Sequence, residues 1–484
     1  MDARTTVEGV EVSTLHWIGG ERVESAGAFA DISPIDETVV AEVARGGEKE
    51  AEGAVAAARD AFASWAATPV AERARILHAV ADGVAARVEP LAAVETRDNG
   101  SLLRSMRSSV MPRVARNFRF FAEQLLGLDG PAFELNGYRS RTEWAPAGVT
   151  AVVTPWNAPL MLATWRVAPA LAAGNTVVLK PPEWAPLTAS LLADVARDAG
   201  LPDGVLNVLQ GTGEEAGAAL VAHAGVDRVA FTGSVPTGKL VAQAAAANLT
   251  PASLELGGKS PLVAFADADL DAVVRQAVGQ FDNAGQVCLA GTRLLVEDDV
   301  YDEFLARLLA AGAKLRQGDP RDPGTDVGPL ISREHLERVD GFVRRAEADG
   351  ARALLGGGPN KQLVGLYYRP TLLVDAPDGS EILTREVFGP VLTAQPFGDE
   401  DQAVALANAT DYGLAAILYT GDQARAERVA SRLVAGTVWV NCFFVRDLRA
   451  PFGGARDSGI GREGGTYSFD FYADVKTVCT APWD

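Results

Sequence analysis

The sequence predicts an α/β protein made of two doubly wound lobes, each built on a parallel sheet. Three features lead to this prediction. Apolar runs rich in β-branched residues recur from residue 149 onward, helical patterns alternate with them, and the glycine pair Gly257-Gly258 separates a first series from a second. Strands that are apolar throughout are buried on both faces, which is typical of a parallel sheet covered by helices on both sides.

Composition limits the possible function classes. The 484 residues, 48% of them hydrophobic, can build large cores in about three domains. A net charge of -19 argues against nucleic acid or an anionic membrane surface as a partner. The three cysteines, Cys288, Cys442 and Cys479, form no CxxC pair, so we expect neither a disulfide framework nor a metal site. With no apolar signal segment and no membrane-length apolar stretch, the chain is expected in the cytoplasm.

The region before residue 149 is expected to hold a hairpin-like entry over residues 16–40 and then alanine-rich helices. Thr68-Pro69 combines a capping residue with a first-turn proline and predicts a helix running to about Arg87.

The first series after this region predicts a sheet of its own. Strands are expected at 149–153, 176–179, 205–209 and 229–232, and helices at 187–199, 216–223 and 237–246.

The second series begins after Gly257-Gly258, which is expected to act as the hinge between the lobes. It predicts a strand at 262–265, a helix ending near Phe281, a strand at 292–296 and a long helix at about 300–315.

Cys288 lies in a glycine-containing loop, residues 282–293, between a helical pattern and a strand. A thiol in such a loop is open to substrate and becomes a nucleophile once its proton is removed. The alternative is a small buried hydrophobe. Glu255 stands between Leu254 and Leu256 and before the glycine pair, so we expect it to be desolvated, with a raised pKa suited to a general base.

Two glycine-containing segments are candidates for a phosphate-binding turn, and only the first has the required features. Phe231-Thr232-Gly233-Ser234 joins a strand to a helix start, whose free N–H groups suit a pyrophosphate, and Ser234 is the expected hydroxyl contact. The glycine-rich segment 211–217 has one residue too many for the usual fingerprint and two acids, so it predicts only a turn.

Lys180 and Glu183 end a predicted strand, where open α/β sheets bind ligands. Glu183 can accept hydrogen bonds from ribose hydroxyls and would repel a 2'-phosphate, which favours NAD over NADP. The alternative for both residues is a surface ion pair.

Together with the stretches around Glu255 and Cys288, further motifs occur in order: Thr154-Pro155-Trp156-Asn157, Lys180-Pro181-Pro182-Glu183, Phe231-Thr232-Gly233-Ser234, Glu386-Val387-Phe388-Gly389-Pro390 and Pro451-Phe452-Gly453-Gly454. With them the chain resembles the NAD(P)-dependent aldehyde dehydrogenase superfamily over nearly its whole length. The resemblance implies that superfamily's fold, in which a small β bridging domain pairs subunits into a homodimer or homotetramer. It assigns the cofactor domain to 1–124 and 143–256, the thiol domain to 257–440, the bridging segments to 125–142 and 466–484, and a substrate-pocket loop to 441–465.

The resemblance also implies individual roles. Asn157 and the Cys288 backbone N–H would hold an oxyanion, although an asparagine in such a turn can instead satisfy the turn's own backbone. Glu386 would bind the nicotinamide ribose, with Phe388 against the ring, unless Phe388 is only an aromatic staple. Trp156, Gly233 and Gly257 complete the expected cofactor contacts.

The loop 441–452 contains Arg446-Asp447-Leu448-Arg449 and resembles that of the 2-hydroxymuconate, 2-aminomuconate and 5-carboxymethyl-2-hydroxymuconate semialdehyde dehydrogenases. The substrates of these enzymes carry carboxylates, which an arginine fork binds bidentately. By the same resemblance Arg113 is a second candidate, Arg449 is the weaker of the loop pair, and Trp165 and Phe452 would line the pocket. Alternatively, Arg446 braces the loop by pairing with Asp447 or another acid, and Trp165 is core.

The expected function is NAD-dependent oxidation of a small aldehyde, such as a muconic semialdehyde, through a cysteine thiohemiacetal and thioester. A broad-specificity or apolar-aldehyde dehydrogenase is the alternative. A cofactor-free cysteine hydrolase or acyltransferase would need a histidine partner, yet the four histidines lie in no matching motif. A catalytically idle binding protein would not need Cys288, Glu255 and Asn157 together.

Overall fold

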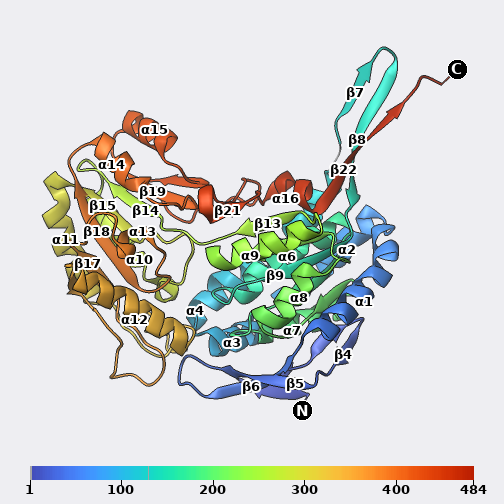
Figure 1. Ribbon diagram of the computed structural model, residues 1–484, viewed down its shortest axis with the longest axis horizontal. Helices are drawn as coiled ribbons and strands as arrows, with labels where there is room; N and C mark the ends of the chain where they lie inside the picture. Colours follow the sequence, from blue (N-terminus) through green and yellow to red (C-terminus); the bar gives the residue numbers. More distant parts are fainter. Residues whose placement is uncertain (1–2, 129, 484) are drawn as a thin grey trace.

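The computed structural model describes residues 3–128 and 130–483. Figure 1 shows two lobes, each with its own sheet and covering helices, and a narrow arm that projects from one of them. No helix in the described ranges is long and apolar enough to cross a bilayer.

The first lobe is built on a mostly parallel sheet with the strand order β21-β13-β12-β9-β10-β11-β3-β4. Its outer strands β21, β3 and β4 run antiparallel to their neighbours. The bounds are β3 His16–Ile18, β4 Glu21–Val23, β9 Val149–Val153, β10 Thr176–Lys180, β11 Leu206–Val208, β12 Arg228–Thr232, β13 Ala252–Glu255 and β21 Gly459–Ile460.

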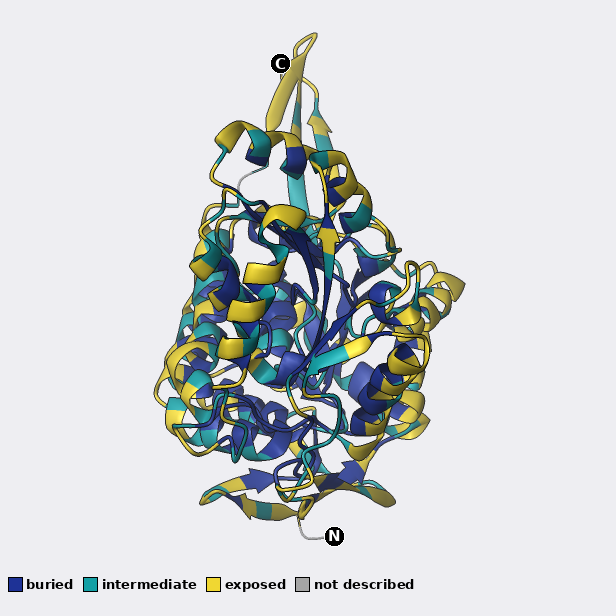
Figure 2. Cartoon of the chain, turned by 90° about the vertical axis from the view of Figure 1, so that its left-hand side faces the viewer, coloured by how far each residue is buried: buried dark blue, intermediate teal, exposed yellow. Residues whose placement is uncertain are grey.

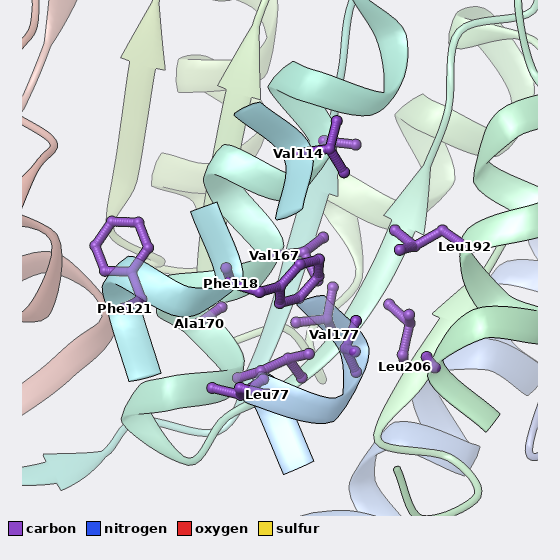
Figure 3. Packing of buried hydrophobic residues seen from close by; sticks show 14 of the residues in the cluster. Leu77, Val114, Phe118, Phe121, Val167, Ala170, Val177, Leu192 and Leu206 are labelled. Carbon is purple, nitrogen blue, oxygen red and sulfur yellow. The ribbon is translucent and has the colours of Figure 1, made fainter. Parts of the chain in front are cut away.

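Helices cover both faces of this sheet, and the strand residues alternate between them. Val152, Val177 and Ala230 pack against one helical layer, whereas Ala151, Val178 and their neighbours pack against the other. Figure 3 shows the first of these cores, in which Val177 and Leu206 of the sheet meet helical residues. The layers are α2 Val70–Ala85, α5 Met111–Leu126, α6 Pro159–Ala173 and α7 Leu187–Asp198 on one face, and α1 Glu48–Ala66, α8 Ala218–Ala222 and α9 Val235–Ala247 on the other.

The second lobe repeats this design with the strand order β16-β17-β18-β15-β14-β19-β20, all parallel except for β16. Its strands are β14 Pro261–Ala264, β15 Arg293–Glu297, β16 Arg352–Leu355, β17 Thr371–Val374, β18 Val391–Phe397, β19 Ala415–Tyr419 and β20 Thr437–Val440. Its main helices are α10 Leu270–Gly279, α11 Asp298–Gly312 and α12 Arg333–Ala348 on one face and α14 Glu400–Ala407 and α15 Gln423–Arg432 on the other.

The arm consists of β7 Ala132–Leu135, β8 Tyr138–Pro146 and β22 Ala473–Thr480. β22 runs antiparallel to β8 from the pair Ala473↔Pro146 to the pair Thr480↔Arg139, so two segments far apart in the sequence lie side by side. Figure 2 shows the arm mostly exposed, in contrast to the buried strands of the lobes.

Shorter elements connect these layers. They are β1 Arg4–Val7, β2 Val10–Ser13, β5 Gly27–Ile32, β6 Val39–Arg45, α3 Val88–Asn99, α4 Leu103–Ser105, η1 Met106–Val110, η2 Gly213–Gly217, η3 Asp282–Gly285, α13 Glu381–Thr384, η4 Arg456–Ser458 and α16 Gly465–Tyr472.

The expected elements of both series are present, with differences at their ends. The hairpin expected over residues 16–40 is in fact two units, because β3 and β4 extend the first sheet whereas β5 pairs with β6 in a separate ribbon. The helix expected at 216–223 begins as the wider turn η2, with Thr212 capping it by accepting a hydrogen bond from Glu215 N, and only 218–222 is α-helical.

Candidate active site

The three residues proposed for catalysis lie where the two lobes meet. Glu255 is the last residue of β13, and Asn157 follows β9 in the same sheet. Both therefore lie at the carboxyl edge of the first sheet, where open α/β sheets bind ligands. Cys288 follows η3 of the second lobe, and the Asn157 side-chain amide donates to Gln286 O in that loop at 2.9 Å.

The thiol loop is held in an unusual backbone conformation. Asn283, Ala284 and Gly285 all have positive φ, at 49°, 53° and 70°. A Cβ on Gly285 would lie 2.1 Å from Gly389 O, so only glycine fits at this point of the turn. Gly258 is equally close to the thiol loop, since its Cβ would lie 2.7 Å from Cys288 O.

The Cys288 thiol holds its proton firmly in this arrangement. Burial raises its pKa to about 12, and the charges of Glu386 and Glu255 act in the same direction, whereas Arg446 opposes them. Because the thiolate is the nucleophilic form, reaction requires a base close to the sulfur.

Glu255 is placed to be that base. Its backbone is fixed on both sides, since β13 pairs with β12 and with β21. Its side chain is buried, and within the described residues Oε1 has no hydrogen-bond partner. Burial raises its pKa, with a further contribution from the charge of Glu463, and nearby arginines oppose the shift. A carboxyl group perturbed in this way can take up a proton near neutral pH.

Two residues to which the sequence assigned no role support this region. Glu463 is buried, accepts a hydrogen bond from Trp165 Nε1 at 2.7 Å and pairs with Arg166. Arg166 is also buried and donates to Phe231 O at 3.0 Å and to Ser253 Oγ at 3.0 Å. A charged residue inside the otherwise apolar segment 159–173 was the signal that could have identified Arg166.

Arg446 faces the catalytic groups from the loop after β20. Its guanidinium lies 3.8 Å from the ring centroid of Phe452 and 4.5 Å from that of Trp165. Its Nε and Nη2 are buried without a hydrogen-bond partner among the described residues. Burial lowers its pKa, while the charges of Glu463, Glu255 and Cys288 oppose this effect. This is a cation with free donors beside the thiol.

The other two arginines differ in their surroundings. Arg113, on α5, lies 5.2 Å from the ring centroid of Trp165 and donates to Asn117 Oδ1 at 2.8 Å. Burial lowers its pKa to about 9, and repulsion by Arg446 adds to the shift. Arg449 instead forms an exposed ion pair with Asp447. Asp447 therefore pairs with Arg449, not with Arg446 as the bracing alternative supposed.

The expected adenosine contacts lie along the same edge of the first sheet. Lys180, at the end of β10, is buried and pairs with Glu183 at 2.8 Å, while Glu183 keeps 35% of its side-chain surface. Burial would raise the pKa of Glu183, but attraction to Lys180 outweighs it and keeps the pKa below its usual value. Ser234 caps α9, with Gly233 immediately before it. A lysine–carboxylate pair and a helix N-terminus at one edge fit a nicotinamide dinucleotide.

The Glu386–Phe388 loop of the second lobe lies against the glycine pair that joins the two lobes. Gly258 N donates to Glu386 Oε1 at 2.9 Å, and a Cβ on Gly257 would lie 2.1 Å from Glu386 Oε2. Burial raises the pKa of Glu386 to about 7. The neighbouring Arg385 is exposed and pairs with Asp411.

An aromatic group joins this loop to the loop that carries Asn157. The ring of Trp156 lies edge-to-face with Phe388 at 5.3 Å and with His335 at 5.2 Å. His335 Nε2 hydrogen-bonds Phe388 O at 2.7 Å, and Arg338 donates to the carbonyls of Glu386 and Val387. No motif in the sequence singles out His335 or Arg338, because their contacts depend on the packing of α12.

Comparison with known proteins decides the family. The model of the aldehyde dehydrogenase family matches residues 22–478. The chain belongs to the aldehyde dehydrogenase family. It is 44% identical over 479 residues to a 2-hydroxymuconic semialdehyde dehydrogenase of Pseudomonas sp. (strain CF600), covering 96% of this chain and 98% of that one. It is 40% identical to the 2-aminomuconic semialdehyde dehydrogenase of Homo sapiens, with coverage of 96% and 97%.

Solved structures agree with this family assignment. HpcC from Thermus thermophilus matches with a TM-score of 0.94 and 45% identity over 96% of this chain and 93% of that one. An indole-3-acetaldehyde dehydrogenase in complex with NAD+ matches with a TM-score of 0.96 and 37% identity over 98% of each chain. The predicted aldehyde dehydrogenase fold and activity are confirmed: the protein is an oxidoreductase that acts on aldehydes with a nicotinamide dinucleotide, NAD(P).

Proposed function

We propose that this aldehyde dehydrogenase oxidises a carboxylate-bearing semialdehyde of the muconic type, with NAD as the oxidant. The observation that carries the proposal is the buried guanidinium of Arg446, whose Nε and Nη2 have no partner among the described residues. Buried donors of this kind are costly to leave without a hydrogen bond, and a substrate carboxylate would satisfy both at once. Relatives named for muconic semialdehydes support the same choice.

The proposed catalytic residues then have the following roles. Glu255 accepts the Cys288 proton as the sulfur attacks the aldehyde carbon, and Asn157 and the Cys288 backbone N–H stabilise the resulting oxyanion. NAD, held by Lys180, Glu183 and Ser234, would supply the hydride acceptor, and loss of the hydride from that carbon would leave a thioester on Cys288. Glu255 releases the first proton to solvent and then takes a proton from water as the hydroxyl adds to the thioester. The carboxylic acid leaves as the Cys288 sulfur recovers a proton from Glu255.

The substrate pocket combines charge with flat apolar walls. The guanidinium of Arg446 lies over the rings of both Trp165 and Phe452, and that of Arg113 also lies over the ring of Trp165. An anion beside Arg446 would relieve the repulsion that lowers the pKa of Arg113. Arg449, paired with Asp447 at the surface, is the least supported of the three as a substrate ligand.

The position of Arg446 over two rings also favours a second candidate function, because a cation held by aromatic rings can serve only to brace the pocket. In that case the enzyme would accept apolar aldehydes of many kinds.

Activity on 2-hydroxymuconic semialdehyde and on an aliphatic aldehyde, compared in the parent and Arg446→Ala, separates the two. Loss of a charge-assisted pair costs about 1.5–3 kcal/mol, roughly 10- to 100-fold in kcat/KM. That loss is expected for the semialdehyde only, and Arg449→Ala is the matched control. An equal loss on both substrates, or none on either, would contradict carboxylate recognition.

The preference for NAD over NADP rests on Glu183. Its carboxylate is held by Lys180 Nζ at 2.8 Å and accepts from Gly213 N at 3.4 Å, so it would lie against a 2'-phosphate. Glu183→Gln should raise kcat/KM for NADP relative to NAD. An unchanged ratio would remove Glu183 from cofactor selection.

Assembly and location complete the proposal. The bridging segments 125–142 and 466–484 contain the exposed side chains Phe133, Leu135 and Tyr138, which suit a subunit interface in a homodimer or homotetramer. The remaining residues divide into the cofactor domain 1–124 and 143–256, the thiol domain 257–440 and the pocket loop 441–465. Three free cysteines suit the reducing cytoplasm.

A further inference from the structure

The oxyanion site is divided between the two lobes. Asn157 belongs to the first sheet, whereas the Cys288 N–H belongs to the loop that follows η3. Stabilising one oxygen with both donors requires that the lobes be held in register to a fraction of an ångström. Something at this boundary must therefore set the separation of the two donors.

Asn283 makes hydrogen bonds across this boundary in both directions. Its Nδ2 donates to Asn157 O at 3.0 Å, and its Oδ1 accepts from Ser101 Oγ at 2.9 Å. Ser101 is buried just after α3, and its own N–H donates to Asn99 Oδ1 at 2.9 Å. The side chain of Asn283 thus links the thiol loop to two separate segments of the first lobe.

The side chain of Asn157 in turn contacts the loop that contains Asn283. Asn157 Nδ2 donates to Gln286 O at 2.9 Å, while Gln286 Nε2 donates back to Asn283 O at 2.9 Å. The Gln286 side chain is itself anchored, because Ile331 N donates to its Oε1 at 2.9 Å. A primary amide carries two N–H donors, so the bond to Gln286 O fixes the plane of the Asn157 amide and leaves its second N–H for the substrate oxygen.

The residue type at 283 fits this task. Asparagine tolerates left-handed backbone better than most residues, and Asn283 has a φ of 49°. Glycine would adopt this φ at least as readily, so the backbone alone does not call for an amide side chain.

We propose that Asn283 is a positioning residue for the oxyanion site, acting through Asn157 to set the distance and orientation of its amide relative to Cys288 N. The inference rests on the oxyanion role proposed above for Asn157. It assigns to Asn283 no contact with substrate or cofactor.

The test measures the rate of the NADH burst in a single turnover, with substrate and NAD both saturating. Asn283→Gly keeps the backbone freedom and removes the amide, and we expect the burst to slow about tenfold, within the effect of displacing one oxyanion donor. KM for NAD and the melting temperature should change little. Ala284→Gly, which loosens the same turn without touching the amide, is the matched control and should retain the parent rate.

A double-mutant cycle distinguishes positioning from simple support of the loop. In an Asn157→Ala background, Asn283→Gly should slow the NADH burst by less than about twofold, because Asn283 acts through the amide that this background lacks. An equal cost in both backgrounds, or a parent-like burst in Asn283→Gly alone, would overturn the proposal. A parent-like burst in Asn157→Ala would instead refute the oxyanion assignment on which it rests.

Ser101→Ala provides a second variant should Asn283→Gly fail to fold. It removes only the hydroxyl that holds Asn283 Oδ1, and we expect a burst about two- to threefold slower, again absent in the Asn157→Ala background. An unchanged burst in Ser101→Ala would then count against the proposal.

Discussion

At the scale of single residues, the catalytic centre combines a thiol and a carboxyl group whose pKa values are both raised above their ordinary values. Burial makes the Cys288 thiol a weaker acid and Glu255 a stronger base than either would be in water. Both shifts have the same cause, because a low-dielectric cleft disfavours any isolated negative charge. Only the ionised form of Glu255 can accept the Cys288 proton, so proton transfer from sulfur to carboxylate during attack on the substrate requires Glu255 to be deprotonated first.

Glu255→Gln should separate the two halves of the reaction. The glutamine cannot accept a proton from water, so we expect steady-state turnover to fall by about 100-fold or more, within the range for general-base catalysis. NADH should still form in a burst close to one equivalent per site, but more slowly than in the parent because the thiol has lost its base; stopped-flow absorbance can measure both the amplitude and the rate. Normal turnover with no burst would show that another group activates the water.

The dependence of kcat/KM on pH should also be set by Glu255. Because the pKa of Glu255 is raised, the carboxylate that acts as base becomes available only above the usual carboxyl range. The kcat/KM of the parent should rise with pH through neutrality. A limb confined to the range below about pH 5 would indicate a base with an ordinary carboxyl pKa.

At the scale of elements, the strands and helices that the sequence predicted are those with long, uninterrupted apolar patterns. No element was predicted between residues 316 and 440, where β16 to β20 and α12 to α15 lie. β9, β10, β12 and β15 lie within one residue of their expected bounds at nearly every end. The division of the expected hairpin was not predicted, because β3 joins the first sheet through β11, a partner distant in the sequence, while β5 pairs locally with β6. For the segment 211–217 the sequence predicted a turn but not the helical form of η2. The same holds within the site. Cys288 and Glu255 lie in recognisable motifs, whereas His335 and Arg338 act only through the docking of α12.

Helix α12 should stabilise the Glu386–Phe388 loop, which is proposed to contact the cofactor. Phe388 has a positive φ of 61°, an uncommon conformation for a bulky residue, and His335 bonds its carbonyl. His335→Ala should raise KM for NAD several-fold and leave alkylation of Cys288 by iodoacetamide unchanged. If both change together, the whole site has been disturbed and not the loop alone.

Helix α3 links two other helices through a buried acid. Glu95 Oε2 accepts from Leu160 N of α6 at 3.2 Å and from Thr188 Oγ1 of α7 at 2.8 Å. Burial raises the pKa of Glu95 to about 8 from its ordinary value of 4.5. Between these two values the folded protein keeps a proton that the unfolded chain has lost, so this residue lowers stability as pH rises toward 8.

Glu95→Gln should remove that dependence. Relative to the variant, the parent should lose up to about 1.4 kcal/mol per pH unit between about pH 5.5 and 7.5, as measured by denaturant unfolding. Glu89→Gln, on the exposed part of the same helix, controls for the change of charge. An identical pH slope in parent and Glu95→Gln would mean that Glu95 is ionised in the folded protein.

At the scale of the whole molecule, the lobes were predictable and the arm was predictable only by resemblance. β7 and β8 were not predicted from periodicity, because β7 spans only four residues and its alternating apolar side chains Phe133 and Leu135 are exposed in a single chain. β22 pairs with β8 through eight residue pairs, a contact that sequence spacing could not reveal. Such an exposed arm is what the proposed homodimer or homotetramer would cover.

Charge placed on the arm should test this interpretation. Phe133 and Leu135 are 62% and 73% exposed, so Phe133→Asp with Leu135→Asp should not disturb either core. We expect the double variant to sediment as a smaller species than the parent in analytical ultracentrifugation. Lys361→Asp, on an exposed loop of the second lobe, is the control. An unchanged mass would exclude these two side chains from the subunit interface.

The retained proton on Cys288 has a consequence beyond catalysis. Peroxide and other electrophiles attack the sulfur anion far faster than the protonated form, and sulfenic acid formation follows the same rule. Because burial raises the pKa of the Cys288 thiol, we expect the resting enzyme to resist oxidative inactivation during the intervals when no aldehyde is bound.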